Sequence, residues 1–227
     1  MKQIGTLIST LFLLLISWCT PEIQAAYFQN GDFSNGDFSG WQGELIDVNL
    51  NSIAVDPNSS GHYQIVDADQ KARLTLDDTY WQNSLYQDFE LDSLDPNESM
   101  EITVWLKWSP TSDIDDGLSV SLLAFNNTDQ VDLLADIPDS ELINGISITR
   151  NITSFAATHS GQTVELIFTI WDTDFNTSDT LEIDNISFNK TPSPVPLPGT
   201  FLLLCSGLIS IGIMRSGRGR NLYQSIV

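Results

Sequence analysis

The sequence is poor in cysteine: only two occur among 227 residues, Cys19 and Cys205, and both lie in hydrophobic segments near the ends. The long segment between them contains no cysteine, which excludes a disulfide framework there. Burial of an apolar core must therefore hold its fold.

Basic residues are also scarce, with nine lysines and arginines against 30 acidic residues and a formal net charge of −21. Four of the nine lie close to the two ends, so the central segment is strongly acidic. Such a surface repels the phosphates of nucleic acids and the headgroups of anionic lipids. Neither is expected as a partner of the central segment.

Histidine is rare as well, since His62 and His159 are the only two. Neither belongs to a recognisable nucleophile motif, and the sequence has no glycine-rich phosphate loop and no thiol–histidine pair. Its carboxylates are so numerous that some pair reaches the spacing of a glycosidase by chance. The sequence therefore predicts that the chain is not an enzyme.

Residues 1–26 have the three parts of a cleavable signal peptide. Lys2 supplies the positive charge, Ile4–Trp18 is a largely apolar run, and Ala25-Ala26 ends the segment with small residues. The run is too short for a stable transmembrane helix. A lipoprotein signal at Cys19 is the alternative, but a bulky tryptophan precedes this cysteine where such signals have a small residue.

The other end also has three parts. Residues 191–198 form a proline-rich linker, residues 199–214 an apolar stretch that predicts a short transmembrane helix, and residues 215–227 a basic tail. Basic residues beside a span stay on the cytoplasmic side, so the acidic central segment is expected outside. The basic residues of the tail are Arg215, Arg218 and Arg220.

The beginning of this region reads Val195-Pro196-Leu197-Pro198-Gly199-Thr200. With the apolar stretch and the arginines it resembles the PEP-CTERM sorting signals, in a VPLP-type variant with Leu197 where the family usually has glutamate. Residues 221–227 follow the arginines, where the family usually stops. The resemblance implies processing by an exosortase-type membrane protease in a Gram-negative bacterium that makes extracellular polysaccharide.

Two alternatives use the same residues. Leu197-Pro198-Gly199-Thr200 also resembles a sortase anchoring signal, although Phe201 stands where that signal has glycine. A plain hydrophobic anchor that is never cut is the other alternative. All three interpretations leave the acidic segment outside the cytoplasm.

Between the two ends, residues 27–190 alternate apolar and polar side chains in short runs bounded by glycine, asparagine, aspartate, serine and proline. This period of two is typical of β-strands, and no amphipathic helix is evident. The expected strands are residues 62–66, 72–76, 84–91, 101–108, 118–125, 163–172 and 180–188. The sequence therefore predicts an all-β fold, a sandwich of two sheets.

Three short motifs support a more specific expectation. The segment Asn30-Gly31-Asp32-Phe33-Ser34 is repeated directly as residues 35–39 and leads to Gly40-Trp41. This opening, the strand Ser84–Phe89 and the closing strand Thr180–Phe188 resemble the galactose-binding-like jelly roll, the fold of many carbohydrate-binding modules. The resemblance implies a jelly-roll β-sandwich.

The same resemblance implies a structural calcium ion between the first and last strands. Carried over to this sequence, its ligands are Asp32 and Asp184, with a carbonyl oxygen of Asn30 or Gly31. Such oxygens suit calcium, and the phase slip after Asp184 predicts a β-bulge that could aim them. The alternative is that these acids cap turns and face water.

Two further acidic segments are weaker candidates for a metal site. Asp172–Asp179 has the alternating acids of an EF-hand loop, but Thr177 and Ile183 occupy the positions that require glycine and glutamate. Asp113–Gly117 has too few ligands. The first is therefore not an ordinary EF-hand, and we expect the second to be a solvated turn.

Aromatic side chains that point away from the core are the candidates for glycan recognition, because sugar rings stack on flat aromatic faces. Strand parity selects Trp105, Trp171 and Tyr86. The other tryptophans considered, Trp41, Trp81 and Trp108, are assigned to packing.

Together these features predict an exported protein, anchored in the inner membrane by its C-terminal helix and then located at the cell surface or in the extracellular matrix. Its expected partners are the processing protease and extracellular polysaccharide. The alternative is a surface protein with a structural role and no ligand.

Overall fold

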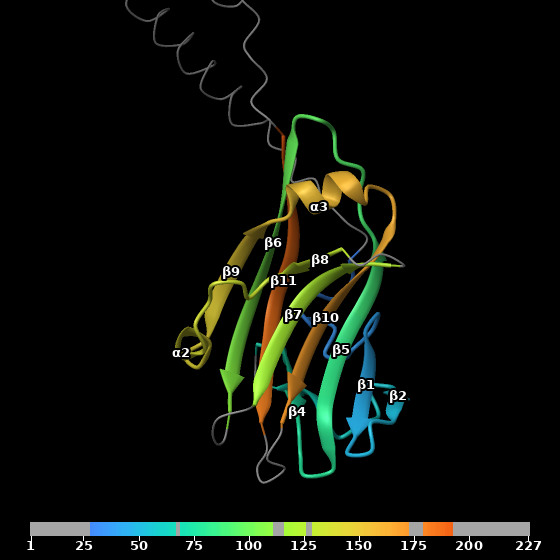
Figure 1. The fold of residues 1–227 in the computed structure, drawn as a ribbon, viewed down its shortest axis with the longest axis vertical. Coiled ribbons are helices and arrows are strands. Elements are labelled where there is room, and N and C mark those ends of the chain that lie inside the picture. Colours follow the sequence, from blue (N-terminus) through green and yellow to red (C-terminus); the bar gives the residue numbers. More distant parts are fainter. Residues whose placement is uncertain (1–27, 67–68, 111–115, 126–128, 173–178, 193–227) are drawn as a thin grey trace, which may run out of the picture. The chain divides into compact units, whose positions relative to one another are not determined.

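The computed structural model describes residues 28–66, 69–110, 116–125, 129–172 and 179–192 (Figure 1). These residues form two antiparallel β-sheets. The expected signal peptide, sorting motif, C-terminal helix and arginines lie outside the described residues, so these expectations stay predictions. Among the described residues, no helix has the length and apolar character needed to cross a membrane.

The larger sheet has six strands in the order β2-β1-β5-β10-β7-β8, and all neighbours are antiparallel. The strands, in chain order, are β1 (Gln42–Asp47), β2 (Ser52–Val55), β5 (Tyr80–Glu90), β7 (Gly117–Ala124), β8 (Gln130–Asp132) and β10 (Thr163–Trp171).

The smaller sheet has five strands in the order β3-β4-β11-β6-β9, again antiparallel throughout. They are β3 (Tyr63–Val66), β4 (Lys71–Thr75), β6 (Glu98–Ser109), β9 (Ile146–Asn151) and β11 (Thr180–Pro192), and the two short helices are α2 (Asp139–Leu142) and α3 (Thr153–Thr158). The chain passes from one sheet to the other between β5, β6 and β7, and again between β9, β10 and β11. The predicted all-β sandwich is confirmed, and its alternation between sheets is consistent with a jelly roll.

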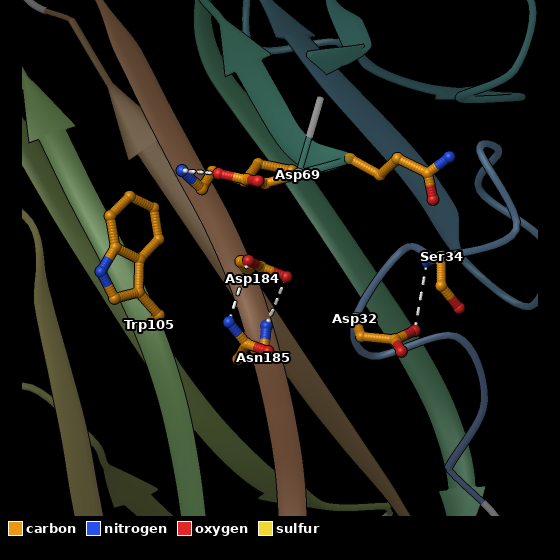
Figure 2. A pocket seen from close by; sticks show the side chains of 8 residues that line it. Asp32, Ser34, Asp69, Trp105, Asp184 and Asn185 are labelled. Atoms are coloured by element: carbon orange, nitrogen blue, oxygen red, sulfur yellow. Dashed lines mark hydrogen bonds and ion pairs between the residues drawn. The ribbon is translucent and has the colours of Figure 1, made fainter. Parts of the chain in front are cut away.

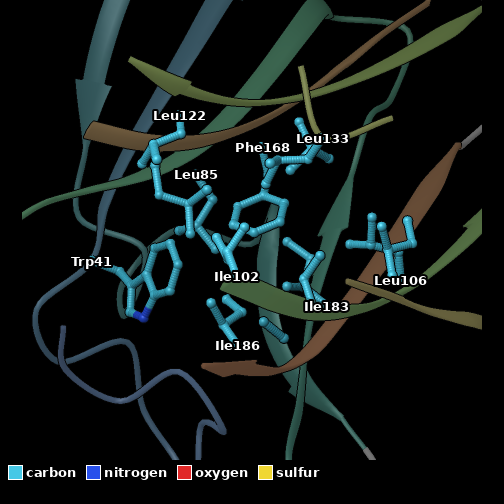
Figure 3. Close-up of a cluster of buried hydrophobic side chains, with 14 of the residues drawn as sticks. Trp41, Leu85, Ile102, Leu106, Leu122, Leu133, Phe168, Ile183 and Ile186 are labelled. Atoms are coloured by element: carbon cyan, nitrogen blue, oxygen red, sulfur yellow. The ribbon is translucent and has the colours of Figure 1, made fainter. Parts of the chain in front are cut away.

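The core lies between the two sheets and is built from alternating residues of each strand (Figure 3). Phe168 and its alternate neighbours on β10 are fully buried, and the corresponding residues of β6 are at most 2 % exposed. Burial of each large apolar side chain contributes roughly 1.5–3 kcal/mol. The inward faces predicted from parity are therefore confirmed.

The repeated segment after Asn30 closes part of the core with aromatic rings. Phe33, Phe38 and Trp41 are buried, and the rings of Phe33 and Trp41 stack with centroids 5.4 Å apart. The two repeats differ in backbone conformation: Gly36 has a φ of +72°, whereas Gly31 at the equivalent position does not have a positive φ. Gly31 instead permits a close approach: its carbonyl accepts a 2.9 Å hydrogen bond from the amide of Ile186 on β11.

A Gly31→Ala substitution is expected to lower the free energy of unfolding by about 1–3 kcal/mol. An added Cβ would lie 2.5 Å from the carbonyl oxygen of Ile186 and 2.8 Å from the ring of Phe28, so the loop must move away from β11. Chemical denaturation measures the loss. Gly61→Ala is the matched control, because a Cβ at Gly61 meets nothing within 4 Å; equal losses in the two variants would contradict the close packing at Gly31.

Candidate functional site

The outer face of the six-stranded sheet carries two of the predicted aromatic side chains. Tyr86 lies opposite Ile167 of β10, and both are among the alternate residues of their strands that point away from the core. Trp171 is four residues further along β10 in the same series. The two aromatic residues therefore share one face, roughly 13 Å apart along the strand direction.

A glycine makes room for Trp171. The indole lies beside Gly117 of β7, its direct partner in the sheet, and a Cβ at this position would fall 2.1 Å from the ring. The ring therefore lies against the backbone of β7, which fixes its place on the sheet.

Hydroxyl and amide side chains fill the row between the two aromatic residues. Ser84 and Thr169 are cross-strand partners whose hydroxyl oxygens lie 3.0 Å apart, and Gln82 donates a 3.2 Å hydrogen bond to the Ser84 hydroxyl. Ser119 of β7 continues the row beside Thr169. Ser84 is fully buried, so the hydroxyls that can bond to sugar hydroxyls are those of Thr169 and Ser119, which are only partly buried. The aromatic rings on either side of this row can stack on sugar rings.

Carboxylates surround Tyr86 on the same face. Glu165 lies directly opposite Asp88, and Glu44 of β1 lies opposite Ser84. Burial and the charges of Asp88 and Glu44 raise the pKa of Glu165 above its usual range. Burial, followed by the charges of Glu44, Glu165 and Asp88, raises the pKa of Tyr86. The four groups thus form one electrostatically linked cluster.

The third predicted aromatic residue, Trp105, lies on the opposite side of the molecule. It belongs to β6 of the five-stranded sheet and lines a pocket of about 560 Å³ together with Asp32, Asp69, Lys71 and Asp184 (Figure 2). The Lys71 ammonium lies 4.7 Å from the centroid of the indole ring. Trp105 therefore cannot act in one site with Tyr86 and Trp171, although the sequence grouped all three.

The predicted calcium ligands Asp32 and Asp184 come together in this pocket. The bulge predicted after Asp184 is confirmed by a register shift between Asp184 and Ser187. Both Asp184 oxygens accept hydrogen bonds from Asn185, at 2.7 Å from its amide and 2.9 Å from its side chain. Burial raises the pKa of Asp184, and the nearby Asp32 and Asp69 add to the increase, while the Asn185 amide and Lys71 oppose it.

The carbonyl groups of the other two predicted ligands already accept hydrogen bonds. The carbonyl of Gly31 accepts from Ile186, and that of Asn30 accepts from the indole Nε1 of Trp41 at 3.2 Å. Asp32 caps its own turn by accepting a 3.1 Å bond from the amide of Ser34 (Figure 2). A calcium ion between Asp32 and Asp184 stays a prediction, and Lys71 competes with it for the negative charge.

A second cluster of acids lies next to the ends of strands from both sheets. Carboxylate oxygens of Asp116, Asp172 and Asp179 lie within 4.8 Å of one another, and the last two side chains are fully buried. Asp116 directly precedes β7, Asp172 follows β10, and Asp179 precedes β11 of the other sheet. The sequence treated these acids as two separate segments and did not group them; the pairing of Gly117 with Trp171 brings Asp116 beside Asp172.

No protein-family model matches the sequence, and no curated protein matches it. Among solved structures, the chain is similar to the carbohydrate-binding module TmCBM61, described in complex with beta-1,4-galactotriose, with 13% identity over 74% of this chain and 99% of that one and a TM-score of 0.41. It is also similar to the Stig cyclase Fisc from Fischerella sp. TAU, with 18% identity over 75% of this chain and 99% of that one and a TM-score of 0.46. A CBM4 structure shares 11% identity over 67% of this chain and 96% of that one, with a TM-score of 0.36.

The prediction that the chain is not an enzyme is corrected by these comparisons. Cyclases from Fischerella sp. TAU, 18% and 20% identical to this chain, stand among the similar structures beside the binding modules. At these identities the likeness concerns the fold and assigns no reaction.

Proposed function

We propose that the domain binds polysaccharide along the outer face of the six-stranded sheet, with Tyr86 and Trp171 as the stacking surfaces. The observation that carries the proposal is the placement of these two residues on one face, with the partly exposed hydroxyls of Thr169 and Ser119 between them. A face of this length suits an extended chain better than a single sugar.

Retention of the purified protein by a panel of insoluble polysaccharides and by polysaccharide-containing native gels tests this proposal. Retention by at least one glycan of the panel is expected. A protein that migrates in every gel as it does in a gel without polysaccharide would contradict the proposal.

We further propose that a calcium ion binds Asp116, Asp172 and Asp179. Three carboxylates within 4.8 Å repel one another when ionised, and a hard divalent cation with oxygen ligands relieves this repulsion. Because Asp179 directly precedes a strand of one sheet while Asp116 and Asp172 flank strands of the other, the ion would tie the two sheets together.

Calcium is therefore expected to raise the melting temperature. An ion that binds only the folded protein stabilises it by about 2.7 kcal/mol at a concentration 100 times its dissociation constant. Calorimetry with calcium or with chelator measures the shift. Asp172→Asn should remove most of it, and the exposed control Asp78→Asn should keep it.

The same calorimetry on Asp184→Asn tests the calcium site between Asp32 and Asp184 that the sequence predicts. Loss of the calcium response in this variant alone would move the ion to the Asp32–Asp184 pocket, and an identical melting curve of the wild type with calcium and with chelator would contradict both sites.

We also propose that the protein is exported by its signal peptide and processed at its PEP-CTERM-like tail, which places the acidic domain at the cell surface or in the extracellular matrix. The motif Val195–Thr200 and the basic tail support this route. Mass spectrometry of the surface protein tests it: a mature C-terminus close to residues 196–198 is expected. A surface protein that still contains Arg220 would instead identify the tail as an uncut anchor.

A further inference from the structure

Positive charge is confined to one of the two sheets. The strands of the five-stranded sheet contain every basic residue that the structure describes, and those of the six-stranded sheet contain none. These residues are Lys71, Arg73, Lys107, Arg150 and Lys190. Two of them pair with acids there, Arg73 with Glu182 at 2.6 Å and Lys190 with Glu98 at 2.8 Å.

The acids of the six-stranded sheet are not neutralised in this way. Glu44, Asp88 and Glu165 form no ion pair with a basic side chain of the described residues, and Glu44 instead accepts a hydrogen bond from the hydroxyl of Ser52. Glu165 and Asp88 lie directly opposite each other, an arrangement that is unfavourable for like charges. A positively charged ligand would relieve this repulsion.

Tyr86 lies in the middle of these carboxylates. Its partner on β10 is Ile167, so Glu165 is its diagonal neighbour on that strand. Its partner on β1 is Gln42, so Glu44 is its diagonal neighbour on the other side. Diagonal neighbours in a sheet are about 7–8 Å apart. Glu44 and Glu165 therefore lie on either side of a ligand group placed over the phenol ring of Tyr86.

The opposite sheet contains the same arrangement with its cation already present. There the Lys71 ammonium lies over the ring of Trp105, 4.7 Å from its centroid, and 3.6 Å from a carboxylate oxygen of Asp69. An ammonium group held between an aromatic face and a carboxylate gains from both attractions. Around Tyr86 the aromatic ring and the carboxylates are present, but no strand of this sheet supplies a basic residue.

We infer that the polysaccharide bound on this face carries protonated amino groups, as in a hexosamine polymer without N-acetyl groups. This inference rests on the proposed polysaccharide-binding function and specifies its ligand class. An ammonium group lies over Tyr86 between Glu44 and Glu165, while Trp171 stacks on a sugar further along the chain. Chains that carry carboxylate or sulfate groups are repelled by the same face.

Isothermal titration with three oligosaccharides of equal length tests the inference: a glucosamine hexamer at a pH that keeps its amines protonated, its fully N-acetylated counterpart, and a hexamer of galacturonic acid. The glucosamine hexamer is expected to bind at least tenfold more tightly than the N-acetylated one at low salt, and this ratio should fall as salt is added. The galacturonic acid hexamer should not bind.

A triple variant, Glu44→Gln/Asp88→Asn/Glu165→Gln, should bring the ratio of the first two affinities close to one. The matched control Glu101→Gln/Asp139→Asn/Glu141→Gln removes the same number of charges from β6 and α2, and it should keep the ratio. Melting curves verify that both variants fold.

The outcomes separate the inference from the function on which it rests. Equal binding of the charged and N-acetylated hexamers would overturn the amine selectivity and leave polysaccharide binding intact. An equal loss of selectivity in both triple variants would assign it to net charge instead of to this face. If no hexamer binds and no polysaccharide of the panel retains the protein, the proposed function itself fails.

Discussion

A Phe168→Ala variant is expected to lose about 3–5 kcal/mol of unfolding free energy, because the substitution leaves a cavity in the centre of the core. Phe168 is fully buried on β10, the strand that pairs with both β5 and β7, and its ring centroid lies 5.9 Å from that of Trp41. For a chain of this size, the loss corresponds to a fall in melting temperature of roughly 6–20 °C. Urea denaturation followed by circular dichroism measures it.

Ile167→Ala is the control for this variant. Ile167 is the next residue of β10, points to the outer face and is only partly buried, so its truncation should cost far less. Equal losses in the two variants would contradict the assignment of inner and outer faces on which the binding site depends.

The second large effect concerns binding. Tyr86→Ala and Trp171→Ala are each expected to weaken polysaccharide binding at least tenfold, about 1.4 kcal/mol, since aromatic anchors dominate such contacts. The two residues are separated by roughly 13 Å along the strands, so their losses should add and the double variant should bind about 100-fold more weakly. Titration of the retained glycan measures both.

Trp105→Ala is the matched control for these variants, because it removes an equally large outward ring from the opposite sheet. The affinity of the Trp105→Ala variant for polysaccharide should stay within about twofold of that of the wild type, since surface changes away from a site have small effects. If Trp105→Ala lowered the affinity while Tyr86→Ala and Trp171→Ala did not, the glycan site would instead be the pocket lined by Trp105 on the five-stranded sheet.

Much of the fold was predictable because its long strands bury one face. The alternation in residues 101–108 and 163–172 identified the inward series of β6 and β10, and the phase slip after Asp184 identified the bulge of β11. Four strands were missed. Strands β2, β8 and β9 lie at or beside sheet edges with little burial: no residue of β2 is buried, and β8 has three residues. Strand β1 is an inner strand, but it has only six residues, and just Gly43 and Leu45 of them are buried.

The candidate site was predictable only in part, for a physical reason. Strand parity shows that Tyr86, Trp105 and Trp171 all point outward, but it does not show which strands share a sheet. The order of strands places β6, with Trp105, in the five-stranded sheet, and β5 and β10, with Tyr86 and Trp171, in the six-stranded sheet. In the same way, the meeting of Asp116 with Asp172 depends on the register between β7 and β10, which local sequence does not reveal.

Nuclear magnetic resonance tests the central claim most directly, because each tryptophan indole N–H gives its own signal. Titration of the isotope-labelled protein with a bound oligosaccharide should shift the indole signal of Trp171 and the amide signals around Tyr86 on β5. The indole signal of Trp105 should remain in place. A shift at Trp105 and its pocket, with the signals of β5 and β10 unchanged, would contradict a glycan site on the six-stranded sheet.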